Sequence, residues 1–304
     1  MPAFCRHSRL VHNCPICSRE QDMEMAPVIS SSAPKVSEPA PRAAAPADRH
    51  GAAEKPRRSP GSRSGVKVRK LERGAEDGYV SGLVQGLKSS ADAERLAYEL
   101  AFAATRLLAL AASPPGVYAE IASGPGDLEE RTWLAVQVAL DPSGERVPWS
   151  VGPWPEAYRN WVARAGSQAA AFSGESYWTP ERRFERVFER LGSVAVMDRD
   201  RRFDLLVTLG RLGLYELEAG KLFFGGENET TWAGKRALGI GDPLLLERRA
   251  LDLATACGIP LAALDLGLHN WGTGSGVERI APGVDPSLEP DPQVLAGVRD
   301  ALGL

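Results

Sequence analysis

Leucine and alanine recur at helical spacing through most of the chain after residue 76, and no segment alternates apolar and polar residues as a half-buried strand does. The apolar positions predict helices over residues 92–112, 127–140, 156–166, 179–192, 201–214 and 292–302. Further helical patterns run before and after a short glycine-containing stretch at residues 238–243. The pattern therefore predicts an all-α fold of seven to nine helices for residues 77–304.

Helix starts and stops support these boundaries. Asp127, Thr179 and Asp242 stand where an N-cap is expected, the last two directly before a proline at the first helical position. Proline and glycine end two of the helices at residues 113–116 and 141–144. Residues 148–155 carry prolines and tryptophans without a period and are expected to form a loop.

The turn Leu238–Pro243 reads LGIGDP and separates two helical patterns. Gly239 and Gly241 permit positive φ angles and allow another backbone to come close. Several amide N–H groups without side chains in front of them, at the start of a helix, favour one phosphate group. The turn is therefore a candidate phosphate site.

The sequence LGIGDPLLLERRA resembles the helix-hairpin-helix of the endonuclease III / MutY class of DNA glycosylases. That resemblance implies a helical bundle, binding of duplex DNA through the hairpin, and an essential aspartate about twenty residues later, on a loop leading into the next helix, which here is Asp265. The arrangement is also similar to the glycosylase-like α-glutamyl/putrescinyl thymine pyrophosphorylases. Two departures stand out, since Asp242 lies near the position of the family's Schiff-base lysine and Cys257 is alone where an iron–sulfur loop would need four cysteines.

Asp265 and His269 are the candidate catalytic residues. A carboxylate beside the sugar stabilises an oxocarbenium-like state during base removal, and a histidine can exchange protons at neutral pH. The alternatives are that Asp265 caps a helix, that His269 is exposed or satisfied in the core, and that Trp271 belongs to the core instead of stacking on a base. These alternatives stay open at the level of sequence.

Cations flank the hairpin. Lys235 and Arg236 precede it, Arg248 follows it, and each is a candidate for DNA phosphate or, alternatively, a solvated residue. The middle of the chain is rich in aromatic residues that could line a base pocket or fill the core, namely Trp149, Trp154, Tyr158, Trp161, Tyr177 and Trp178.

The N-terminal residues 1–19 contain three of the four cysteines in the order Cys5-x-His7 and Cys14-x-x-Cys17. Three thiolates and one imidazole complete a tetrahedral zinc shell, so Cys5, His7, Cys14 and Cys17 predict a small structural zinc site, with His12 as the other choice of imidazole. A frayed terminus with fortuitous cysteines and a redox Cys-x-x-Cys are the alternatives.

Residues 20–76 are rich in Ala, Pro and Ser and lack aromatic residues, which predicts a disordered linker. Charge is uneven along the chain: residues 1–76 carry 14 Lys or Arg and 8 Asp or Glu, whereas residues 77–304 carry 22 and 31. A basic arm on an acidic body is typical of chains that meet polyanions through the arm.

The sequence has no apolar run long enough for a membrane span and no apolar region typical of a signal peptide, so a cytoplasmic location without membrane contact is expected. Walker, HExxH and G-x-S-x-G motifs are absent from it. We expect a DNA base-processing protein that excises or modifies thymine-derived bases. The alternative is a non-catalytic, zinc-containing module that binds DNA or protein.

Overall fold

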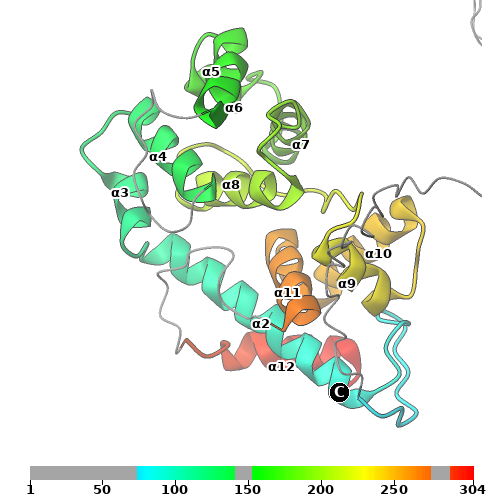
Figure 1. Ribbon diagram of the computed structural model, residues 1–304. Coiled ribbons are helices and arrows are strands. Elements are labelled where there is room, and N and C mark those ends of the chain that lie inside the picture. The colour runs from blue at the N-terminus through cyan, green and yellow to red at the C-terminus, as the bar shows by residue number, and fades with distance from the viewer. Residues whose placement is uncertain (1–73, 141–152, 275–287) are drawn as a thin grey trace, which may run out of the picture. The chain divides into compact units, whose positions relative to one another are not determined.

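The computed structural model describes residues 74–140, 153–274 and 288–304, and this part of the chain is helical throughout, without a strand (Figure 1). Its eleven helices are α2 (Ser90–Ala112), α3 (Val117–Ser123), α4 (Leu128–Leu140), α5 (Pro153–Ala165), α6 (Gln168–Ser173), α7 (Pro180–Leu191), α8 (Arg199–Arg211), α9 (Glu229–Leu238), α10 (Pro243–Cys257), α11 (Leu261–Thr273) and α12 (Pro292–Leu302). The all-α prediction is confirmed for these residues, and the predicted number of helices was too low. The predicted segments 1–19 and 20–76 lie outside them, apart from residues 74–76.

The long helix α2 is the element on which much of this part is built, because α11, α12 and α8 all contact it (Figure 1). Leu96, Leu100 and Leu107 recur along it at helical spacing and are buried. Helix α11 comes closest at Gly267, where an added Cβ atom would lie 3.0 Å from the Leu100 Cα atom. A side chain at this position would push the two helices apart.

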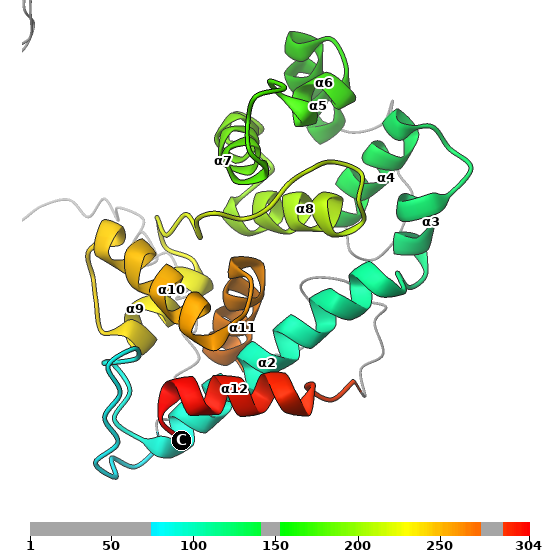
Figure 2. The same ribbon diagram turned by 180° about the vertical axis from the view of Figure 1, so that it is seen from behind.

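Helix α8 contacts both α2 and α4 on one hand and α7 on the other. Figures 1 and 2 both show α5, α6 and α7 on the opposite side of α8 from α2. Helices α9, α10 and α11 contact one another in a second group, and α12 contacts α2 and α10. The glycine-containing turn therefore lies between α9 and α10, whereas the described aromatic residues from the middle of the chain lie on α5 or directly before α7.

The predicted caps are confirmed. The Glu130 N–H donates to Asp127 Oδ1 at 2.8 Å, the Arg182 N–H to Thr179 Oγ1 at 3.2 Å, and the Leu245 N–H to Asp242 Oδ1 at 2.9 Å. Each of these side chains satisfies an amide that has no partner within its own helix.

Several boundaries differ from the prediction. Helices α3 and α6 were not predicted, because seven and six residues are too few to establish a period. Helix α5 begins at Pro153, inside the predicted loop 148–155, and α8 begins two residues earlier and ends three residues earlier than residues 201–214.

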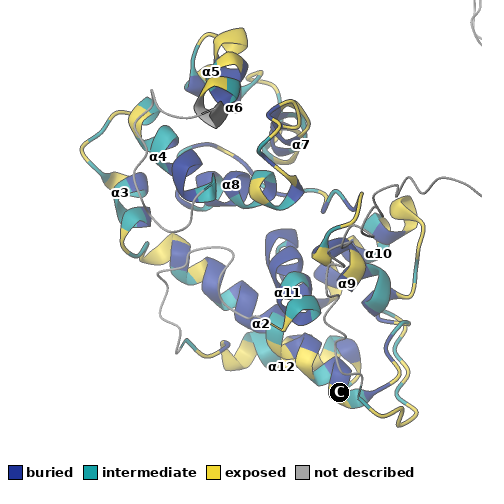
Figure 3. Cartoon of the chain, in the orientation of Figure 1, coloured by how far each residue is buried: buried dark blue, intermediate teal, exposed yellow. Residues whose placement is uncertain are grey.

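Apolar side chains from all of these helices form one buried cluster, which Figure 3 shows as the dark faces turned inward. Aromatic rings continue it through α5 and α6: Tyr158 stacks on Trp161 with centroids 5.6 Å apart, and Phe172 contacts both Trp161 and Tyr215 at 5.3 Å. Tyr158 and Trp161 therefore belong to the core, as one of the two sequence interpretations held. Burial raises the pKa of Tyr215 to about 12.

Among the described residues, no single helix has the length and apolar character to cross a membrane; two bent pairs of consecutive helices would pass that test only when taken together.

Candidate functional site

The turn between α9 and α10 has the predicted local form. Gly239 ends α9 with a left-handed φ of 71°, and Asp242 caps α10 ahead of Pro243. Of the two glycines that permit a positive φ, only Gly239 adopts one, since Gly241 is not among the glycines with a positive φ. One left-handed residue is enough to reverse the chain here.

The two glycines of the turn face different surroundings. An added Cβ at Gly239 would lie 3.0 Å from the Gly86 nitrogen, because the segment before α2 packs on this side and the Gly86 N–H donates to the Ala237 carbonyl at 3.0 Å. At Gly241 an added Cβ would have nothing within 4 Å. One side of the turn is thus covered by the chain itself, and the other side is open.

Exposed residues surround the open side of the turn. Gly241 and Asp242 are exposed, Leu244 is 82 % exposed, and Leu245 is 54 % exposed. The positive end of the α10 dipole therefore faces solvent, which favours an anion. Pro243 has no N–H group and the Leu245 N–H already donates to the Asp242 carboxylate, so the start of this helix also carries one negative charge of its own.

The three predicted DNA-contacting cations differ in what they do. Arg236 lies 3.8 Å from Asp92 through its guanidinium and stacks over the Trp271 ring at 4.8 Å, so it joins α9 to α2 and α11. Lys235 lies over the exposed Trp232 ring at 5.8 Å, and Arg248 is exposed on α10. Lys235 on α9 and Arg248 on α10 thus belong to the two helices that the turn connects, and Lys235 is half-buried. A DNA contact by any of the three stays a prediction.

Asp265 lies in the middle of α11 and is fully buried. The resemblance placed it on a loop before a helix, and the alternative was a helix N-cap; both placements were wrong, since α11 begins at Leu261 and its N-cap is Pro260. Asp265 Oδ1 lies 2.5 Å from the Arg199 guanidinium, which is itself 9 % exposed. The carboxylate therefore faces a neighbouring helix and not solvent.

Arg199 is the partner that sequence reasoning missed. It begins α8, contacts the Leu222 carbonyl and Asp200, and stacks over the Phe203 ring at 4.6 Å. Its setting in a run of charged residues, DRDRRFD, gave no sign of burial.

The segment Leu222–Phe224 is an irregular strap between α8 and α9. Glu247 on α10 accepts the N–H groups of Leu222 and Phe224 at 2.8 and 2.6 Å, and between them Phe223 adopts a left-handed φ of 54°. Phe223 stacks on Phe188 with centroids 3.9 Å apart. A left-handed phenylalanine is costly, so these contacts hold the strap in one conformation.

His269 and Trp271 follow Asp265 on α11. Trp271 is 3 % exposed and its indole N–H donates to the Asp92 carbonyl at 3.2 Å, so the core interpretation is confirmed. His269 is half-buried, one helical turn after Asp265. Its catalytic role stays a prediction.

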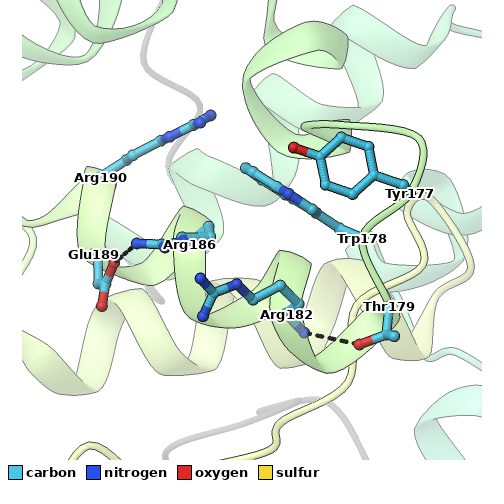
Figure 4. Close-up of a pocket in the computed structure, with 7 residues that line it drawn as sticks. All are labelled: Tyr177, Trp178, Thr179, Arg182, Arg186, Glu189 and Arg190. Carbon is cyan, nitrogen blue, oxygen red and sulfur yellow. Dashed lines mark hydrogen bonds and ion pairs between the residues drawn. The ribbon is translucent and has the colours of Figure 1, made fainter. Parts of the chain in front are cut away.

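A hollow of about 520 Å³ lies at the start of α7 (Figure 4). Its walls combine aromatic rings with a row of arginines: Tyr177, Trp178, Thr179, Arg182, Arg186, Glu189 and Arg190. Figure 4 shows Arg182 and Arg186 below the rings of Trp178 and Tyr177, with Arg190 to the left of both rings. This combination of stacking surface and positive charge suits a nucleotide.

The aromatic pair is anchored by a buried arginine. Arg183 donates to the Ser173 carbonyl at 2.6 Å and to the Trp178 carbonyl at 3.3 Å, and it also binds the Glu216 carbonyl at 2.8 Å. Both ends of the segment that carries Tyr177 and Trp178 are thereby tied to α7. Unlike the three arginines of the hollow, Arg183 is buried and points into the protein.

The remaining site predictions lie outside the described residues. Cys5, His7, Cys14 and Cys17 fall there, as does Trp149, and the side chain of Trp154 is not described either. No group of three or more His, Cys, Asp or Glu within the described ranges could hold a metal ion. The zinc site remains a prediction from sequence.

Comparison with known families gives one match. Residues 148–271 match the family described as alpha-glutamyl/putrescinyl thymine pyrophosphorylase clade 3. The match covers less than half of the chain but includes the arginine-lined hollow, the turn at Gly239–Gly241 and Asp265. It agrees with the second of the two resemblances, and it is consistent with modification of DNA bases. No curated protein and no solved structure matches the chain.

Proposed function

We propose that this chain modifies thymine-derived bases in DNA. The observation that carries the proposal is the match of residues 148–271 to a family named for thymine pyrophosphorylases. Handling pyrophosphate requires cationic groups, and the same residues contain the arginines of the hollow at α7. The matched segment thus combines a family assignment with side chains suited to that chemistry.

The open side of the turn is the proposed seat for a DNA phosphate. The support is physical: an exposed Gly241 with nothing near its Cβ position, the N-terminus of a 15-residue helix, and the cations Lys235 and Arg248 close in sequence. Such a contact positions the duplex without reading its sequence.

Modification fits the arrangement better than excision. A carboxylate that assists base removal must reach the sugar, whereas Asp265 is fully buried in an ion pair with Arg199. Transfer of a pyrophosphate group from a nucleoside triphosphate to a hydroxyl on a thymine-derived base forms a P–O bond to that hydroxyl oxygen, breaks the bond between the α-phosphate and the β-phosphate of the donor, and releases a nucleoside monophosphate. Such a transfer needs a hydroxyl on the base and no carboxylate at the sugar. We therefore place Asp265 in the support of the fold and the chemistry on the base itself.

Salt-dependent binding of duplex DNA tests the proposal. The logarithm of the affinity should fall linearly with the logarithm of salt concentration, and Arg248→Gln should reduce the slope by about 1. Arg299→Gln is the matched control, because Arg299 is also an exposed arginine, paired with Glu94 on another helix. A slope near zero for the natural chain would exclude phosphate neutralisation and favour a protein-interaction module.

A further inference from the structure

We propose that the hollow at α7 is a nucleotide-binding site, with phosphate on Arg182, Arg186 and Arg190 and the base against Tyr177 and Trp178. The nucleotide is either one residue of a DNA strand or a free nucleoside polyphosphate that donates to it. This inference rests on the proposed function only for the choice between these two sources.

The three arginines form a continuous row because they are spaced four residues apart on one helix. Arg182 and Arg186 are 45 % and 42 % exposed, and Arg190 is also exposed. The Cβ atoms of residues four apart on a helix lie roughly 5–6 Å from one another, so this row can offer one guanidinium to each of several phosphates along a nucleotide strand.

The positive charge is local to this hollow. Three arginines and one glutamate line it, which leaves a formal charge of +2, in a body whose residues 77–304 carry more acidic than basic side chains. An attraction for anions in such a body comes from a particular cluster and not from the overall charge.

The ion pairs on this face do not neutralise the row. Arg182–Glu185 at 2.8 Å and Arg186–Glu189 at 3.1 Å are solvent-exposed pairs within one helix, which contribute little to stability and yield readily to a phosphate. Glu185 also binds Lys221, and this hydrogen bond is the main cause that lowers its pKa. The single carboxylate of Glu185 is therefore shared between two cations, Arg182 and Lys221.

The aromatic wall is held in place on one side and open on the other. The Trp178 ring covers Gly174, where an added Cβ would lie 2.4 Å from the ring, and Arg190 stacks over it at 5.2 Å. Tyr177 is 80 % exposed and meets Trp178 edge-on at 6.5 Å. Tyr177 is thus exposed and lies beside the Trp178 ring, whose backbone carbonyl accepts a hydrogen bond from Arg183, and this pair is a surface on which a base can stack.

A second hollow of about 490 Å³ adjoins the first, since both are lined by Glu189 and Arg190. It adds another cation, Arg164, and the edge of Trp161. Together they offer room for more than a single phosphate, as a nucleotide requires.

Binding measurements on the full chain test the site. Calorimetry with a nucleoside triphosphate and with inorganic pyrophosphate is compared with fluorescence anisotropy of a labelled single-stranded oligonucleotide. Arg186→Gln should weaken binding by about tenfold, and Tyr177→Ala by about 5- to 100-fold, through loss of a charge-assisted bond and of base stacking. Both side chains are exposed, so neither change should alter folding.

Arg201→Gln is the control, because Arg201 is 47 % exposed, lies beside an acidic residue three positions before it, and does not line the hollow. Loss of triphosphate binding in the site variants identifies a free nucleotide as occupant, and loss of oligonucleotide binding alone identifies the DNA strand. Affinities for every probe equal to those of the natural chain would overturn the proposal. Site-dependent binding without any base modification would instead contradict only the proposed function.

Discussion

Asp265 and Arg199 show that the type of a residue and its spacing in the sequence do not determine its surroundings in the folded protein. The sequence placed an aspartate at the distance expected for a catalytic group, yet the side chain lies within a helix and pairs with an arginine that nothing near it in the sequence suggests. A buried pair of this kind contributes little when intact but is costly to break, because the remaining charge stays in a poorly solvated place.

We therefore expect Asp265→Asn to destabilise the fold by roughly 3–5 kcal/mol. The change keeps the shape of the side chain and removes the charge opposite Arg199. Urea unfolding followed by circular dichroism measures the effect, and Asp252→Asn, at an exposed position on α10, is the control. Unchanged stability together with lost activity would return Asp265 to a catalytic role.

Glu99 on α2 provides a test that depends on pH. Burial raises the pKa of its carboxyl group, and a hydrogen bond with Asn270 opposes that rise. The folded protein thus holds this proton more tightly than the unfolded chain, so the stability contributed by Glu99 is complete below about pH 4 and is lost as the pH rises through the folded pKa.

Glu99→Gln should accordingly be more stable than the natural protein at about pH 8, with the difference shrinking towards pH 4. Thermal unfolding across this range measures it, and Glu175→Gln, at an exposed position, should show no such trend. A difference that grows on acidification would mean that the carboxylate is favoured in the folded state.

At the scale of elements, the turn between α9 and α10 contains two glycines with different roles, Gly239 and Gly241. Gly239→Ala should cost about 1–2 kcal/mol, because an L-residue resists the left-handed conformation and the new methyl group crowds Gly86. Gly241→Ala should change stability by no more than about 0.5 kcal/mol but weaken DNA binding, since its methyl group would stand on the open side. Chemical unfolding and DNA titration of both variants decide this, and equal losses of stability would refute the distinction.

The sequence was sufficient for elements whose signals are local. The cap at Asp242, the proline behind it and the spacing of leucines along α2 each act within a few residues, so these helices could be predicted. The strap at Phe223 could not, because Glu247 and Phe188 hold it from helices distant in sequence. The hollow at α7 could be predicted only in part. Tyr177 and Trp178 were candidates for a base pocket in the sequence, but Arg183 holds them beside the arginines of the hollow only in the folded chain.

At the scale of the whole molecule, the cysteine-rich residues 1–19 are expected to hold one zinc ion through Cys5, His7, Cys14 and Cys17. Elemental analysis of the purified full chain should give close to one zinc per chain, and Cys17→Ser should lower it. Cys257→Ser is the control, because Cys257 is buried in α10 and its burial raises the pKa of the thiol to about 11. Less than about 0.3 zinc per chain would reject the site.

Uneven charge and the family match together point to DNA at this scale, since a basic segment precedes an acidic body that carries its own local cations.

Modification of a thymine-derived base is the claim on which the account depends. The most direct measurement is nucleoside mass spectrometry of duplex DNA that carries thymine or thymine hydroxylated on its methyl group, incubated with the full chain and a nucleoside triphosphate. The account predicts that the hydroxylated nucleoside becomes heavier by a pyrophosphate group, with one nucleoside monophosphate released for each group transferred, that thymine stays unchanged, and that no free base is released. Release of free base, or an unchanged hydroxylated nucleoside with folded protein bound to the DNA, would contradict it.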